Sequence, residues 1–270
     1  MPKISPRACL PWAAKESIII YIHVDTSDAH YKMCAHFLLS EVIVTDTTVD
    51  SAYHSPLTVE GCQRQWILHR AASLEELWDS MTADPASVAF EDERSPYWTE
   101  LWPSSITLAQ WLHQNKADIA SRVCLDVGCG LGLTSMVAAW CGARVIGMDY
   151  EPQALHYARQ NALANQVPMP LWAVMDWRHP AVKKGSVERV FGGDIMYEKR
   201  FVLPVLRFLE HVLAPGGKVW IAEPCRTVYD AFRNALHQFG WTGYKVHSAT
   251  VDPLYAQPVK VTVHVWELTR

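Results

Sequence analysis

The chain has 270 residues, of which 50% are hydrophobic and 19% charged, so it is long enough to bury one large core and carry a short extension. Its net charge of −4 excludes the strongly basic surface that nucleic-acid binding requires. No apolar run approaches the ~20 residues of a membrane span, the first residues lack the order of a signal peptide, and the odd number of cysteines, seven, gives no disulfide pattern. We therefore expect a protein of the reducing cytoplasm, with no membrane partner.

The first part of the chain gives little structural signal. Residues 1–55 contain one strand-like apolar run, Ile18–Val24, and are interpreted as an extension. One hypothesis places the natural start near Thr58. The run Arg64–His69 predicts a strand, and Ser73–Met81 predicts a helix, since a serine is followed three residues later by a glutamate, as in a capping box.

A tryptophan-rich segment precedes the first long helix. Residues 83–94 are acidic and predict a loop. The following stretch, Ser95–Ser105, holds a Tyr-Trp pair and a Leu-Trp-Pro-Ser sequence. Next, Ile106–Gln114 predicts a helix, because leucine and tryptophan recur on one face.

The most informative stretch is Val123–Gly132, an apolar strand that runs into an acidic residue and three glycines at alternate positions. Glycine permits the sharp turn from a buried strand into a helix, predicted over Leu133–Trp140, and brings bare backbone against a ligand. A second strand, Arg144–Gly147, closes on Asp149. A carboxylate about 20 residues past such glycines is well placed to bind ribose hydroxyls.

The spacing of the glycines indicates which ligand is bound. A dinucleotide-binding motif that begins at Gly128 needs a small residue at position 133, where this chain has Leu133. Asp126 would repel a pyrophosphate and attract an ammonium group. The combination resembles motif I of the class I S-adenosylmethionine-dependent methyltransferases, whose cofactor carries an amino group and no phosphate. A plain structural corner remains the alternative.

Two further strands end in polar or aromatic residues. The run Leu171–Met175 leads into Asp176-Trp177, and the run Arg189–Gly193 leads into the segment from Asp194 to Tyr197. In an open α/β sheet, ligands bind at the carboxyl ends of the strands, so the four runs indicate one crevice.

The C-terminal part predicts the rest of the sheet. A helix over Val202–Leu213, a Pro-Gly-Gly turn and a fifth strand, Lys218–Ala222, come first. After them, Thr227–Phe239 predicts an amphipathic helix ended by a glycine, and Gly243–Val251 and Val259–Leu268 alternate like antiparallel strands. We therefore predict an α/β fold: a Rossmann-like, seven-stranded methyltransferase sheet with helices on both faces and a C-terminal antiparallel hairpin.

Four ordered motifs together resemble the family 16 methyltransferases, seven-strand enzymes of which many methylate lysine in proteins. The motifs are Tyr97-Trp98 with Leu101-Trp102-Pro103-Ser104, Leu125 to Gly130, Asp176-Trp177, and Gly193 to Tyr197. The resemblance covers roughly residues 60–270 and is strongest to the electron-transfer-flavoprotein β-subunit lysine methyltransferases and their bacterial relatives. Glu223-Pro224-Cys225-Arg226 departs from the Gly-Asp-Pro-Gly-Arg expected there, which leaves the substrate open. The implied division is an extension (1–55), a cofactor-covering region (56–121) and a methyltransferase domain (122–270).

The resemblance implies a role for each residue of a cofactor site. The three glycines would reach the methionine moiety, with one carboxylate near its ammonium group and another on the ribose, while an aspartate and a tryptophan bracket the adenine and two tryptophans close the site. The residues are Gly128, Gly130, Gly132, Asp126, Asp149, Asp176, Trp177, Trp98 and Trp102. For each tryptophan, core packing is the alternative.

Asp194 and Tyr197 are the candidates for catalysis. A lysine ammonium must lose a proton before it can attack a methyl group, and Asp194 would position the amine and assist that loss while Tyr197 forms a wall. The alternative is that Asp194 caps the turn after its strand. Glu198, Glu223 and Arg226 either edge the substrate entrance or lie in a solvated loop.

No metal site is expected, because five histidines show no ligand spacing with each other or with cysteine: His113, His156, His179, His211 and His237. The sequence thus predicts an S-adenosylmethionine-dependent methyltransferase that modifies lysine in a protein substrate. The alternatives are a small-amine N-methyltransferase and a non-catalytic S-adenosylmethionine-binding module. A nucleic-acid substrate is disfavoured, since the Asn/Asp-Pro-Pro-Tyr run is missing. The oligomeric state stays open.

Overall fold

A computed structural model of the chain describes residues 19–21, 56–71, 77, 79, 96–252 and 259–270. Most of the predicted extension, the acidic loop over 83–94 and all but two residues of the helix predicted over 73–81 lie outside these residues.

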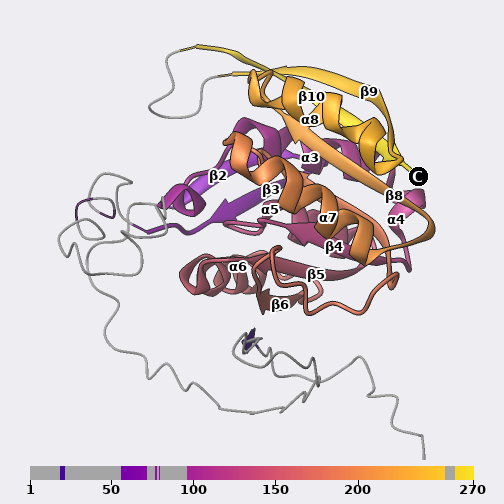
Figure 1. Ribbon diagram of the computed structural model, residues 1–270. Helices are drawn as coiled ribbons and strands as arrows, with labels where there is room; N and C mark the ends of the chain where they lie inside the picture. The colour runs from indigo at the N-terminus through magenta and orange to yellow at the C-terminus, as the bar shows by residue number, and fades with distance from the viewer. Residues whose placement is uncertain (1–18, 22–55, 72–76, 78, 80–95, 253–258) are drawn as a thin grey trace, which may run out of the picture.

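The core of the fold is an eight-stranded sheet whose strands lie in the order β1-β6-β5-β4-β7-β8-β10-β9 (Figure 1). All neighbours are parallel except at β10, which runs antiparallel to both β8 and β9. The bounds are β1 (Ile19–Tyr21), β4 (Val123–Val127), β5 (Arg144–Asp149), β6 (Leu171–Val174), β7 (Val187–Gly193), β8 (Leu213–Glu223), β9 (Thr242–Val251) and β10 (Val261–Thr269). The α/β fold with a C-terminal antiparallel hairpin is confirmed, and the short β1 adds an edge strand beside β6.

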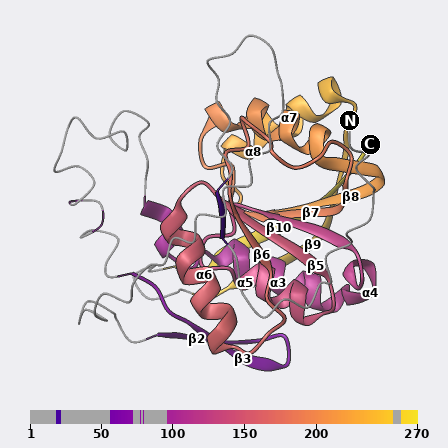
Figure 2. The same ribbon diagram turned by 90° about the horizontal axis from the view of Figure 1, so that it is seen from below.

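Helices cover both faces of the sheet. Figure 2 shows α7 (Val202–Val212) and α8 (Val228–Leu236) on one side, and α3 (Pro103–Gln114), α5 (Leu133–Trp140) and α6 (Pro152–Ala164) on the other. Shorter helical segments are η1 (Pro96–Thr99), α4 (Lys116–Ile119), η2 (Lys199–Phe201) and η3 (His237–Phe239). Helix α6 is not predicted from the sequence.

The two-residue period of the strands divides the core. On β8, Val219 and Ile221 pack with α7 and α8, whereas Trp220 and Ala222 pack with α3 and α5. Each central strand therefore buries both of its faces, which explains why its sequence reads as a continuous apolar run.

Several element boundaries differ from the predictions by a few residues, and three of the differences are informative. Helix α3 starts three residues early, because Pro103 occupies its first turn, where no backbone N–H is needed. Strand β10 starts at Val261, and Val259 is exposed rather than part of the strand. The Pro-Gly-Gly turn is looped out of β8, since Val187 pairs with Leu213 while the pairing resumes at Lys218.

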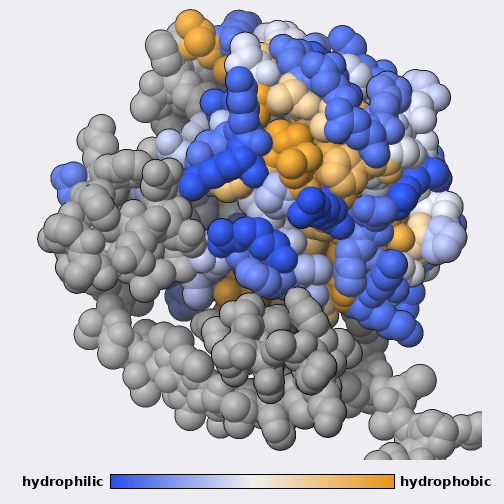
Figure 3. Space-filling view, in the orientation of Figure 1, coloured by the Kyte–Doolittle hydropathy of each residue, from blue (hydrophilic) through white to orange (hydrophobic). Residues whose placement is uncertain are grey.

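One face of the molecule is mostly polar outside the residues drawn in grey. On the face shown in Figure 3, hydrophobic side chains gather near the middle, in the region where Figure 1 places α7 and α8, and hydrophilic ones surround them. Within the described ranges no helix is both long enough and apolar enough to cross a bilayer.

A separate hairpin, β2 (Leu57–Gly61) and β3 (Arg64–Leu68), packs against α6. Asn161, fully buried on α6, accepts a hydrogen bond from the backbone N–H of His69 (2.6 Å) and donates to its carbonyl (3.1 Å). The same amide donates to the carbonyl of Leu131, at 3.0 Å. One side chain therefore ties the hairpin, α6 and the glycine-rich loop together.

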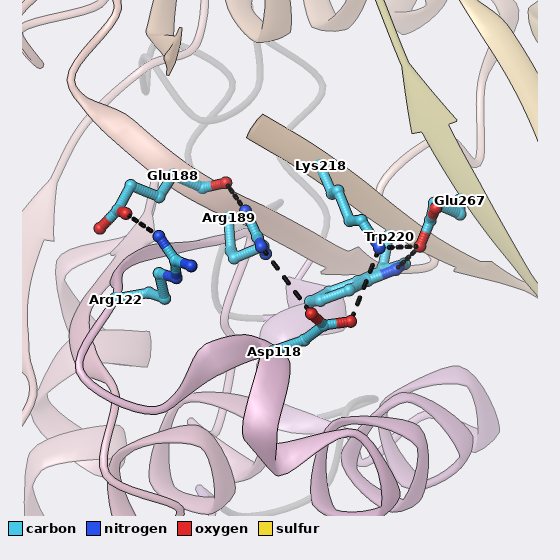
Figure 4. A network of polar contacts seen from close by, with 7 residues as sticks. All are labelled: Asp118, Arg122, Glu188, Arg189, Lys218, Trp220 and Glu267. Carbon is cyan, nitrogen blue, oxygen red and sulfur yellow. Dashed lines mark hydrogen bonds and ion pairs between the residues drawn. The ribbon is translucent and has the colours of Figure 1, made fainter. Parts of the chain in front are cut away.

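A network of polar contacts joins α4 to β7, β8 and β10 at the end of the sheet where β7 begins (Figure 4). Asp118 lies 3.9 Å from Arg189 and 3.6 Å from Lys218, and Lys218 lies 3.4 Å from Glu267. Glu267 also accepts a hydrogen bond from the indole of Trp220, at 2.9 Å. This end of the sheet carries structural ion pairs, while the opposite end carries the cavity described below.

Asp126, on β4, fastens the strand to α5. Its Oδ2 accepts hydrogen bonds from the hydroxyls of Thr134 and Ser135, both at 2.6 Å, and the side chain is almost fully buried. Burial raises the pKa of Asp126 to about 7, against the lowering effect of these two hydroxyls.

We predict that Asn161→Ala destabilises the fold by about 2–4 kcal/mol, because it leaves one buried and two partly buried backbone groups without this partner. For a chain of this size the change corresponds to a melting temperature lower by roughly 5–10 °C, measurable by calorimetry. The exposed Asn234 of α8 provides the matched control, and Asn234→Ala should melt within ~2 °C of the wild type. Equal melting of the two variants would contradict the assignment.

Asp126 should also make stability depend on pH. Its pKa is 3.8 when unfolded and about 7 when folded, so between these values the folded state binds a proton that the unfolded state releases. Its contribution to the free energy of unfolding should therefore fall as pH rises from about 4 to 7, by up to about 1.4 kcal/mol per pH unit. Denaturant titrations of wild type and Asp126→Asn at several pH values isolate this contribution as the difference between the two curves. Parallel curves would refute it.

Candidate functional site

A cavity of about 690 Å³ opens at the carboxyl ends of β4, β5, β6 and β7, as the sequence predicts. Its wall combines the glycine-rich loop after β4, the segments after β5, β6 and β7, the tryptophan-rich segment before α3, and Arg226 after β8. Of the residues assigned to a site from the sequence, the cavity brings together Trp98, Trp102, Gly128, Gly130, Gly132, Asp149, Asp176, Trp177, Asp194 and Tyr197.

The glycine-rich loop forms the floor of the cavity. At two of its positions a different steric constraint requires glycine. Gly132 has a φ of 84°, and a Cβ there would lie 2.8 Å from the Cβ of Ala158 on α6. Gly130 has a φ of 49°, and a Cβ there would lie 3.4 Å from the carbonyl oxygen of Trp98. The first therefore allows close packing of the loop on α6, and the second allows η1 to lie directly over the loop.

Asp149 links this loop to the end of β5. Its Oδ2 accepts a hydrogen bond from the backbone N–H of Gly130 (2.9 Å), and its Oδ1 accepts one from that of Glu151 (3.0 Å). Burial raises the pKa of this carboxyl. Because a carboxylate offers about four acceptor positions, Asp149 can still accept hydrogen bonds from ligand hydroxyls in the cavity.

Asp126 does not line the cavity, contrary to its expected place beside a ligand ammonium group. Its carboxylate is directed at Thr134 and Ser135 of α5, as described above. The residue therefore acts on the loop indirectly, by holding the start of α5. The sequence shows the acid at the end of the strand but not the direction of its side chain.

The segment after β6 contributes an acid and an indole. Asp176 accepts hydrogen bonds at 2.7 Å from both the backbone N–H and the Nε of Arg178. Trp177 packs edge-on against Phe201, with ring centroids 5.4 Å apart. Both residues line the cavity, but the carboxylate of Asp176 already has a cationic partner.

Aromatic side chains from η1 and its flanks form the opposite wall. The ring of Trp98 stacks on Tyr157 of α6 at 5.8 Å, so this residue packs into the core as well as lining the cavity. The indole of Trp102 donates a hydrogen bond to the carbonyl of Tyr97 at 2.9 Å. The ring of Tyr97 in turn lies edge-on to Tyr197, 5.4 Å away. No role for Tyr97 is predicted from the sequence.

Asp194, after β7, is held by Arg226. The guanidinium donates to both carboxylate oxygens, from Nε at 3.1 Å and from Nη2 at 2.9 Å, and Asp194 itself is buried. Its φ of 55° is unusual for a residue other than glycine and turns the chain sharply into the cavity wall. This bidentate pair joins two segments 32 residues apart, a distance in sequence that no local pattern reveals.

Of the three remaining candidates, Tyr197 and Glu198 line the cavity and Glu223 does not. Tyr197 lies at the wall with its ring 5.0 Å from that of Phe201, and burial raises its pKa to about 12, so the hydroxyl stays protonated at neutral pH. Glu198 lines the cavity and pairs with Arg200, at 2.8 Å. Glu223 is buried beside β10 and is not among the residues that line the cavity.

The positive charges of the cavity wall are all paired with acids. Its three arginines, Arg178, Arg200 and Arg226, are each bound to an acid that also lines the wall: Asp176, Glu198 and Asp194, respectively. An arginine held in such a pair is a poor partner for a phosphate. The arrangement fits a nucleoside ligand without a pyrophosphate better than a dinucleotide.

Comparisons with known proteins agree with this geometry. A family model described as "Methyltransferase domain" matches residues 124–217. The electron transfer flavoprotein beta subunit lysine methyltransferase of Danio rerio is 30% identical over 58% of this chain and 60% of its own length. The histone-arginine methyltransferase METTL23 of Homo sapiens is 32% identical over 47% of this chain and 70% of its own length.

A solved structure shares the fold. The 16S rRNA N2 G1207 methyltransferase RsmC of T. Thermophilus superposes with a TM-score of 0.53 at 13% identity, over 83% of this chain and 52% of that one. The chain spans about three fifths of the length of several curated relatives that it matches. From its strand order, its glycine-rich loop and these relatives, the chain belongs to the class I S-adenosylmethionine-dependent methyltransferases.

Proposed function

We propose that the chain binds S-adenosylmethionine in the cavity and transfers its methyl group to the side-chain nitrogen of a lysine in a protein. The observation that carries the proposal is the position of Asp194 and Tyr197, which lie in the wall of the same cavity as the glycine-rich loop. A cofactor on the loop and an acceptor beside Asp194 would therefore share one enclosed space.

The residues of the cavity fit the cofactor. The glycine-rich loop offers backbone to the methionine part, and Asp149 offers free acceptor positions to the ribose. Trp177 offers an apolar surface to the adenine, and Trp102 covers the cavity from the side of α3. Asp176 would accept from the adenine amine with the lone pairs that Arg178 leaves. The bound cofactor supplies a methyl group on a positively charged sulfur.

The protein's part in the reaction is to orient the acceptor and exclude water. An amine attacks only through an uncharged nitrogen, and an ammonium has an ordinary pKa of about 10.4. Asp194 would accept a hydrogen bond from the amine and take part in removing its proton, while Tyr197 and Tyr97 wall off solvent. Arg226 keeps the Asp194 carboxylate in place for this purpose.

Relatives support a protein substrate. Besides the Danio rerio lysine methyltransferase, the protein N-lysine methyltransferase METTL21A of the same organism is 28% identical over 48% of this chain. The cysteines among the described residues are free thiols, which suit a reducing compartment and support a cytoplasmic location. The net charge of −4 favours a protein over a nucleic acid.

Arginine is the second candidate acceptor, because the human relative is named a histone-arginine methyltransferase. The cavity wall already places one guanidinium, that of Arg226, on Asp194 and 5.9 Å from the ring of Trp102. The wall therefore contains surroundings that suit a guanidinium, the group that an arginine acceptor carries. A small-amine acceptor and a non-catalytic role remain further alternatives, and the experiments below separate them.

We predict opposite effects of two aspartate substitutions. Asp194→Ala should reduce methyl transfer by at least about 100-fold and leave the dissociation constant for the cofactor within about twofold, because it removes a group that handles the acceptor. Asp149→Ala should instead weaken cofactor binding by about 10-fold or more, since it removes a charged hydrogen-bond acceptor. Calorimetric titration and single-turnover transfer measure the two effects.

Two variants control this experiment. Asp194→Asn preserves the size of the side chain, so it separates the loss of the charge from a loss of packing. Asp252→Ala removes an exposed carboxylate of the C-terminal hairpin region and should change neither quantity. Wild-type turnover in both Asp194 variants would remove Asp194 from the mechanism.

The acceptor can be identified with a labelled methyl donor. Incubated with cell lysate, the wild-type protein should transfer label to a protein band that the Asp194→Ala variant leaves unlabelled, and hydrolysis of that band should give methyl-lysine. Methyl-arginine would establish the second candidate, and label in the small-molecule fraction would indicate a small amine. Tight cofactor binding without any transfer would contradict an enzymatic role.

A further inference from the structure

Three side chains that can bind a metal ion converge beside the end of β8, away from the cavity. They are Glu223, the last residue of β8, Cys225, two residues further on, and His264 of β10. One ligand atom from each, a carboxylate oxygen, the thiol sulfur and a ring nitrogen, lies within 4.8 Å of the other two. None of the three lines the cavity. The cluster is therefore separate from the proposed methyltransferase site.

The pairing of β8 with β10 explains why two of the donors meet. Glu223 and His264 are directly opposite each other in this antiparallel pair, so their side chains lie on the same face of the sheet. Cys225 follows at a turn in which its own φ is 57°. The third donor thus comes from the turn that ends the strand.

The carboxylate of Glu223 lacks a partner for one of its oxygens. Its side chain is fully buried, and its Oε1 accepts a hydrogen bond from the indole of Trp266 at 3.0 Å. Its Oε2 is buried without a hydrogen-bond partner among the described residues, and no ion pair to Glu223 is found there. A buried carboxylate is costly unless it is paired, and a metal ion would supply the missing positive charge.

His264 and Cys225 are both available to a cation. The Nδ1 of His264 lies 2.9 Å from the hydroxyl of Ser248, a contact that orients the ring. Metal-binding histidines are commonly oriented in this way. Cys225 is exposed, and among the described residues its thiol makes one hydrogen bond, to the carbonyl of Thr262 at 3.5 Å. Its exposure gives an ion a path into the site.

We propose that Glu223, Cys225 and His264 form a binding site for a divalent transition metal, with zinc as the ion that the donor set fits best. Zinc accepts carboxylate oxygen, imidazole nitrogen and thiolate sulfur, and three protein ligands leave a fourth position for water at the exposed side. The side chains must close in, because zinc binds these atoms at about 2.0–2.3 Å. Calcium and magnesium are disfavoured, since they require oxygen ligands.

The site has a direct structural consequence. Cys225 precedes Arg226, the residue that holds Asp194 in the cavity wall. A metal ion that ties Cys225 to β8 and β10 would hold the turn that carries Arg226. The site does not depend on the proposed acceptor, and metal binding can be measured without any methyl transfer.

The test uses the full chain, stripped of metal by a chelator and dialysed. Zinc titrated against a competing chelator should bind with one high-affinity ion per chain, and Cys225→Ser, His264→Ala and Glu223→Gln should each weaken that binding by more than about 10-fold. Cobalt(II) should give the charge-transfer absorption of a thiolate ligand in the wild type. That absorption should disappear in Cys225→Ser.

Cys62→Ser is the matched control, because Cys62 also lies in a turn with positive φ but is not one of the three clustered residues. It should retain both the zinc affinity and the cobalt absorption, and circular dichroism verifies that each variant is folded. The proposal is overturned if the stripped protein binds no stoichiometric zinc, or if folded Cys225→Ser binds zinc and cobalt as the wild type does. Failure of methyl transfer with intact metal binding would count against the proposed function alone.

Discussion

The packing of one indole, that of Trp172, determines where the cavity can form. The side chain is fully buried on β6 and lies across Gly147 of the neighbouring strand, where a Cβ would come within 2.5 Å of the ring. It also reaches Gly132, where a Cβ would lie 3.1 Å away. The glycine-rich loop can therefore descend onto α6 and the sheet only because two glycines make room for this ring. Held down by this close packing, the loop forms the floor of the cavity.

Opposite charges complete the wall that the packing defines. At the ends of β6 and β7, and at the start of η2, an acid projects into the cavity and is held by an arginine: Asp176 by Arg178, Asp194 by Arg226, and Glu198 by Arg200. Asp149 differs, because its partners are the backbone N–H groups of the loop and of the turn after β5. It is thus an acid of the wall with no arginine partner among the described contacts, which suits it to neutral hydroxyl donors.

The sequence predicts the sheet well because each central strand is buried on both faces and reads as an apolar run, and because the glycines mark the turn after β4. It also predicts which strand ends meet. The sequence does not predict the direction in which a side chain points. Asp126 stands next to the glycine-rich loop in sequence, yet α5 supplies two hydroxyls that hold it inside the core. Arg226 and Asp194 meet because β7 and β8 are parallel neighbours, a long-range contact that spacing cannot reveal. Helix α6 is not predicted from the sequence, because the buried polar Asn161 interrupts its apolar face.

The pair of Asp194 and Arg226 bears on how an acceptor amine would become reactive. A lone buried carboxylate would stabilise the charged ammonium and so hold the acceptor in its unreactive form. With Arg226 bound to both of its oxygens, Asp194 contributes little net charge to the wall while its remaining lone pairs can still orient an amine. In the proposed reaction, the guanidinium thus offsets the attraction that the carboxylate alone would exert on an ammonium group. The pair would therefore offer the amine a directional hydrogen-bond acceptor without a charge that holds it protonated, which is what the proposed transfer to nitrogen needs.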